Sequence, residues 1–139
     1  MQILARVLLF LQGAMCVVYG LVVAFNLDAL AAYMGLAIVT GDGRAEMLTM
    51  YLGLSSALGL FMLFAALSGR RIYEAMLILC LSMLGITIGR LLGWLLFNTG
   101  DYILSSLAYD VPMIMLTTWC YWRLYLAAPL DQHGKTAGA

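Results

Sequence analysis

Long apolar segments alternate with short polar ones along this chain of 139 residues. Four segments, 3–25, 47–67, 72–97 and 102–126, hold very few charged residues. A helix rises about 1.5 Å per residue, so roughly 20 apolar residues are enough to cross a bilayer. The pattern therefore predicts an all-α integral membrane protein, with four transmembrane helices in a single domain over residues 1–139.

The connections predict how these helices run. Residues 68–71 and 98–101 leave room only for a turn, so the helices on either side of each are antiparallel. Residues 29–39 are apolar but too short to span, with Asp28 placed to cap a helix at their start and a turn expected at 40–43. We expect an up-down-up-down four-helix bundle with a short interfacial helix between helices one and two. That short helix is either a passive connector or a cover over a pocket.

Composition and charge narrow the function classes. Hydrophobic residues make up 65% of the chain and charged residues 10%, which is too little polar surface for a soluble globule. The formal net charge is zero and no basic run occurs, so nucleic-acid binding is not expected. Arg6, Arg70 and Arg71 lie at the ends predicted to share one side of the membrane. By the positive-inside rule, both termini are expected in the cytoplasm.

Charged residues within or beside the spans mark a candidate site. Arg90 and Asp110 lie about two helical turns from the predicted outer ends of the third and fourth spans, so they should be level. Glu46 lies above them at the start of the second span. Because a charge in hydrocarbon is costly, these three should converge inside the bundle, either as a structural ion pair that fixes helix register or as a ligand site. Polar neighbours expected near this trio are Arg44, Tyr51, Tyr109 and Ser106.

Small residues at helical spacing predict where the helices pack. The third span carries Gly85, Gly89 and Gly93, each four residues apart, which would let another backbone approach closely. The second span offers Gly53 in the same kind of pattern. These glycines are expected to serve helix packing within the chain, or else an interface between copies. Further small-residue ridges are expected at Ser55 with Gly59 and at Cys16 with Gly20.

Short motifs carry a family resemblance. The runs Arg-Ala-Glu at 44–46, Tyr-Leu-Gly-Leu at 51–54 and Gly-Arg-Leu-Leu-Gly at 89–93, followed by Asp110 in the fourth span, resemble small bacterial four-span proteins catalogued as domain of unknown function 4345. The similarity covers most of the chain. It implies a location in the bacterial inner membrane and a core built from the arginine and the acids of these motifs.

Two function classes follow from these observations. The first is a non-enzymatic membrane protein that binds a lipid or hydrophobic small molecule through the Arg/acid cluster, or serves as an accessory subunit of a membrane complex. The second is a small dimeric proton-coupled transporter that uses Asp110 or Glu46. The sequence shows no catalytic constellation, and no metal or cofactor is expected. The expected partners are membrane lipid, other membrane subunits or a second copy of the chain.

Overall fold

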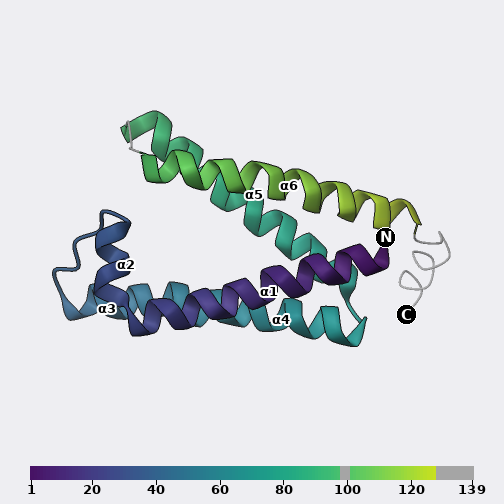
Figure 1. The fold of residues 1–139 in the computed structure, drawn as a ribbon, viewed down its shortest axis with the longest axis horizontal. Coiled ribbons are helices and arrows are strands. Elements are labelled where there is room, and N and C mark those ends of the chain that lie inside the picture. Colours follow the sequence, from purple (N-terminus) through teal and green to yellow (C-terminus); the bar gives the residue numbers. More distant parts are fainter. Residues whose placement is uncertain (98–100, 128–139) are drawn as a thin grey trace, which may run out of the picture. The chain divides into compact units, whose positions relative to one another are not determined.

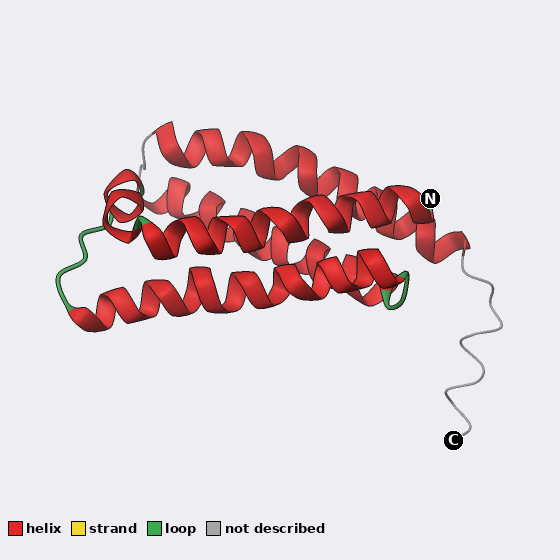
Figure 2. Cartoon of the chain, turned by 60° about the horizontal axis from the view of Figure 1, so that its bottom comes forward, coloured by secondary structure: helices red, strands yellow, loops and turns green. Residues whose placement is uncertain are grey.

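The computed structural model describes residues 1–97 and 101–127, and this part of the chain is helical with no strand (Figures 1 and 2). The elements in chain order are α1 (Gln2–Phe25), α2 (Leu27–Tyr33), α3 (Gly41–Met47), η1 (Leu48–Leu54), α4 (Ser55–Ser68), α5 (Ile72–Phe97) and α6 (Asp101–Ala127). The predicted all-α class is confirmed. The connection 98–100, where a turn is predicted, lies outside the described residues.

Four of the helical stretches are long and apolar enough to cross a membrane. They are Gln2–Phe25, Gly41–Ser68, Ile72–Leu96 and Ile103–Leu126. The second stretch combines α3, η1 and α4 and starts earlier than the predicted span 47–67. Thr40 explains the early start, because its hydroxyl accepts a hydrogen bond from the Gly43 amide at 3.2 Å and caps the helix.

The chain divides into two compact units. One contains Arg6–Arg70, and the other contains Met1–Ala5 with the described residues of Arg71–Ala139. Each unit is built around an antiparallel pair of long helices. The single four-helix domain expected from the sequence stays a prediction, as does the bundle topology.

In the first unit, α1 and α4 lie side by side through small residues (Figure 1). A Cβ built on Gly13 would lie 2.7 Å from the Gly59 carbonyl oxygen, and one built on Gly59 would lie 2.7 Å from the Gly13 carbonyl oxygen. A Cβ on Gly20 would lie 2.8 Å from the Tyr51 carbonyl oxygen. Only glycine fits these three positions, and the backbones meet directly along this line, which we call the glycine seam.

Arg6 closes the other end of the same pair. Its Nε donates to the Ala66 carbonyl at 2.7 Å and its Nη2 to the Leu67 carbonyl at 3.0 Å. These carbonyls belong to the last turn of α4, where intrahelical donors run out before Gly69 ends the helix in the left-handed conformation (φ 69°). A cation here also meets the negative end of the helix dipole. The carboxyl end of α4 is therefore held by the amino end of α1.

The helix between α1 and α3 is shorter than the sequence predicts. The apolar stretch 29–39 was expected to be helical, but α2 ends at Tyr33 and Gly35 follows with a φ of 73°. Glycine adopts this left-handed conformation at little cost, so the helix stops there. Asp28 lies in the first turn of α2 and does not cap it. The expected turn at 40–43 is also wrong, since Gly41 begins α3.

The helix Gly41–Ser68 contains a π-helical segment, η1, between two α-helical ones. In a π-helix each amide bonds to the carbonyl five residues back, and such segments are rare in proteins. Beside it, the Ser56 Oγ is buried and has no hydrogen-bond partner among the described residues. This irregular stretch lies where the helix passes Gly20 of α1.

The second unit is a hairpin of α5 and α6, drawn side by side in Figure 1. The Tyr73 hydroxyl, near the start of α5, donates to the Leu124 carbonyl near the end of α6 at 3.1 Å. Arg90, late in α5, contacts Asp110, early in α6. The start of α5 contacts the end of α6, and the later part of α5 contacts the early part of α6, so the two helices are antiparallel.

Candidate functional site

The centre of the candidate site is an ion pair between α5 and α6. The Arg90 Nη1 lies 2.5 Å from the Asp110 Oδ2. The Asp110 side chain is only 4% exposed, whereas the Arg90 side chain is 31% exposed. A buried carboxylate requires a partner of opposite charge, and a charge-assisted hydrogen bond of this kind is the strong form. The structure thus brings together the two residues that the sequence predicts to be level.

Arg90 has no partner other than Asp110 among residues 1–97 and 101–127. A guanidinium carries five N–H donors in a rigid planar fork. Leu91 and Leu92, which follow it, are exposed apolar side chains. The arginine is therefore a partly exposed donor group in an apolar neighbourhood, with donors left over after its charge is balanced.

Pro112 lies inside α6, two residues after Asp110, and the helix continues through it. Proline lacks an amide hydrogen, so the bond that would run to the Ala108 carbonyl is not made. The bend that the sequence predicts at this level stays a prediction. The Ala108 carbonyl, two residues before Asp110, therefore lacks its helical hydrogen-bond donor.

Glu46 and Arg44 belong to the other unit. Both are exposed residues of α3, and the Arg44 Nη2 lies 2.6 Å from the Asp28 Oδ1 in a solvent-facing ion pair. Arg44 therefore bridges α3 to α2. The expectation that Glu46 serves as a second acceptor for Arg90 stays a prediction.

The remaining polar candidates fall into two groups. Tyr51, in η1, donates its hydroxyl to the Met34 sulfur at 3.7 Å, and its ring meets Tyr19 edge-on with centroids 5.9 Å apart. Tyr109 and Ser106 lie on α6, where Tyr109 is exposed and Ser106 is half-buried. Ser106 is one turn before Asp110 and thus shares a face of α6 with it.

The predicted glycine stripe of α5 is open. A Cβ built on Gly85, Gly89 or Gly93 would meet no heavy atom within 4 Å, so α5 and α6 do not approach each other through this face. Gly53 is exposed, and its nearest contact would be the Leu48 carbonyl oxygen at 3.9 Å. Use of these four glycines for packing or for an interface between copies stays a prediction.

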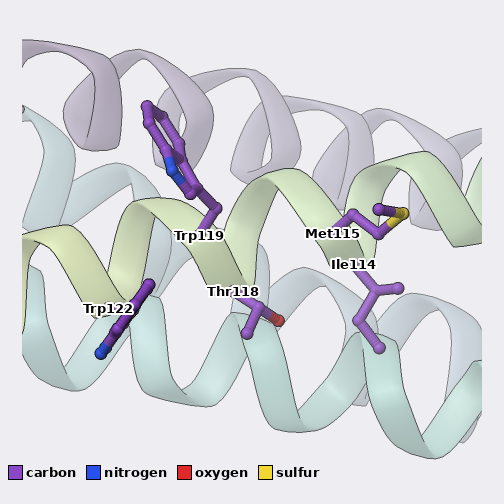
Figure 3. A pocket seen from close by; sticks show the side chains of 5 residues that line it. All are labelled: Ile114, Met115, Thr118, Trp119 and Trp122. Carbon is purple, nitrogen blue, oxygen red and sulfur yellow. The ribbon is translucent and has the colours of Figure 1, made fainter.

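An open apolar groove lies on α6, in the part of the helix after Asp110. Its lining residues all come from this helix and are shown in Figure 3: Ile114, Met115, Thr118, Trp119 and Trp122. Ile114 lies one turn after Asp110, so the near end of the groove is one turn from the acid along α6.

Sequence reasoning missed two features. Arg6 was interpreted only as a topology signal, although it caps α4. Gly13 was not singled out, although its backbone lies directly against that of Gly59 in the first unit. The seven-residue spacing of Gly13 and Gly20, two turns apart on one face of α1, was the available signal.

No known protein family, characterised protein or solved structure matches this chain. The resemblance to domain of unknown function 4345 therefore stays a prediction, and no relative points to catalysis. Within the part of the chain that the structure describes, no three His, Cys, Asp or Glu side chains gather as a metal site would require.

Proposed function

We propose that this chain is a multi-pass membrane protein that binds a lipid or other hydrophobic small molecule beside Arg90 and Asp110 without catalysing a reaction. The observation that carries the proposal is the partly exposed guanidinium of Arg90, paired with a buried carboxylate. An ionisable group placed within an apolar span is a functional candidate by default. The adjoining groove on α6 supplies an apolar surface for the rest of such a ligand.

We place the protein in the bacterial inner membrane with both termini in the cytoplasm. Support comes from Arg6, which bonds to the end of α4 just before Arg70 and Arg71. Arg6 and Arg70 therefore belong to one end of the first unit, and Arg71 follows Arg70 directly in the chain. The positive-inside rule favours the cytoplasm for that end.

Native mass spectrometry of the detergent-purified protein tests the proposal. The wild type should retain a bound lipid or small molecule, and Arg90→Met should lose it. A matched variant, Arg70→Met, removes an exposed arginine outside the hairpin and should retain the ligand. A wild type that carries no adduct would refute ligand binding. Co-purification of another membrane subunit would instead support the accessory-subunit role.

The transporter alternative requires an acid that exchanges protons with water. Asp110 is nearly inaccessible and bonded to Arg90, which weighs against it, whereas Glu46 is exposed. Uptake driven by a pH gradient in liposomes, abolished by Glu46→Gln, would favour this alternative over the binding role.

A further inference from the structure

The charge balance of the Arg90–Asp110 pair limits the kind of ligand that fits. One guanidinium and one carboxylate add to zero net charge. The other charged residues of α5 and α6, which are Glu74, Asp101 and Arg123, lie more than two turns away along their helices. Within the hairpin, the pair is thus an isolated neutral unit.

An anionic group would disturb that balance. A phosphate or carboxylate placed on Arg90 would compete with Asp110 and leave one negative charge unbalanced in apolar surroundings, which is costly. A neutral acceptor, such as an ester or ketone carbonyl, takes the spare N–H donors without adding charge. The pair therefore favours neutral oxygen acceptors over anions.

The surface next to the pair favours an amphiphile. The groove on α6 presents two tryptophans and two aliphatic side chains, with Thr118 as its hydroxyl-bearing member (Figure 3). An apolar chain or ring in this groove would have its polar end near Asp110, one turn from Ile114. This order of polar and apolar surface matches a lipid with a small neutral head.

We propose that the ligand is an uncharged, carbonyl-bearing lipid, whose oxygens accept hydrogen bonds from Arg90 and whose apolar part lies along the α6 groove. The inference rests on the proposed binding function and names its ligand class. Asp110 acts as a positioning residue that also excludes anionic lipids.

Thermal unfolding in detergent with two lipids of matched acyl chains tests the ligand class. Dioleoylglycerol is the neutral probe and dioleoyl phosphatidic acid the anionic one. The wild type should bind the neutral lipid at least tenfold more tightly, measured from the concentration dependence of Tm. Equal or stronger binding of phosphatidic acid would overturn the inference.

Asp110→Asn provides the sharper test. It removes the negative charge at nearly constant shape and leaves Arg90 cationic, so the preference should reverse in favour of phosphatidic acid. Arg70→Gln, an exposed arginine outside the hairpin, should keep the wild-type preference. An Asp110→Asn variant that folds and still prefers the neutral lipid would refute the role of Asp110.

A second variant covers the case in which Asp110→Asn does not fold. Arg90→Met combined with Asp110→Leu removes both charges together and should bind both lipids equally weakly; an unchanged preference would overturn the inference. The wild-type outcomes separate the two proposals. A wild type that retains a lipid in native mass spectrometry but prefers phosphatidic acid refutes only the ligand class, whereas a wild type that binds no lipid refutes the proposed function as well.

Discussion

In the α1–α4 pair, backbone meets backbone at Gly13 and Gly59, whereas the polar contacts of the α5–α6 pair include Arg90 with Asp110 and Tyr73 with the Leu124 carbonyl. The first pair uses glycines to bring two helices close together. The second pair leaves its glycine stripe open and is joined by directional polar contacts, an ion pair among them.

The contrast teaches which residues tolerate change. Close backbone approach gains many weak contacts and fails when a side chain is added. An ion pair depends on two groups and fails when either one is removed. The same chain therefore has one pair sensitive to enlargement and another sensitive to loss of charge.

The largest effect is expected from Asp110→Ala. It leaves the Arg90 guanidinium unpaired, and breaking a buried ion pair on one side costs about 3–5 kcal/mol. Thermal unfolding in detergent, followed by tryptophan fluorescence, measures the change. Glu74→Ala, an exposed acid on the same hairpin, is the control and should unfold close to the wild type. Equal unfolding of the two variants would show that the ion pair does not hold the hairpin.

Gly59→Ala should rank second. Its new methyl group would lie 2.7 Å from the Gly13 carbonyl oxygen and 2.9 Å from the Cys16 Cβ, and overpacking of this kind costs about 1–3 kcal/mol. The matched variant is Gly89→Ala, where the methyl group enters open space and the helix gains up to about 1 kcal/mol in propensity. The two substitutions should shift Tm in opposite directions. A destabilised Gly89→Ala would indicate that the α5 stripe docks against another helix.

Arg6→Gln should have a smaller effect. It removes two hydrogen bonds to the last carbonyls of α4 and a cation at the helix terminus, together worth roughly 1–2 kcal/mol. Hydrogen exchange should accelerate mainly in the last turn of α4, around Leu67. Arg70→Gln at the adjacent exposed arginine should leave this exchange unchanged. Uniform acceleration along α1 and α4 would argue against a local capping role.

Asp28→Asn should change stability least. The Asp28–Arg44 pair is exposed on both sides, and exposed pairs contribute about 0.2–1 kcal/mol and weaken with salt. Thermal unfolding at low and high salt should show a small destabilisation that disappears at high salt. A loss as large as that of Gly59→Ala would mean that the bridge between α2 and α3 organises the whole unit.

Hydropathy was enough to predict the long helices, because an uncharged apolar run of about 20 residues is typical of a membrane-spanning helix and of few other structures. The predicted segment 72–97 has the same bounds as α5. The predicted first span starts one residue later than α1, and the predicted fourth span is one residue shorter than α6 at both ends. Thr40 and Gly35 shifted the elements between the first two long helices, since capping and left-handed backbone depend on a single residue. A hydropathy pattern averages over many residues and therefore does not reveal such single-residue effects.

The level of Arg90 and Asp110 was predictable because both lie at similar distances from one short connection. The rotation of each helix about its axis was not predictable. Whether α1 meets its neighbour through Gly13 or Cys16, and whether α5 uses its glycines, depends on the sum of many side-chain contacts over a whole face. Arg6 could not be assigned as a cap without knowing that α1 and α4 are neighbours.

The π-helical segment η1 has a consequence for the direction in which α3 presents its side chains. A π-helix has more residues per turn than an α-helix, so the loss of one residue within Leu48–Leu54, with a return to α-helical bonding, would leave Glu46 facing in nearly its present direction. A deletion that η1 does not absorb would instead turn the Glu46 carboxylate by about 100° around the helix axis, because an α-helix has 3.6 residues per turn.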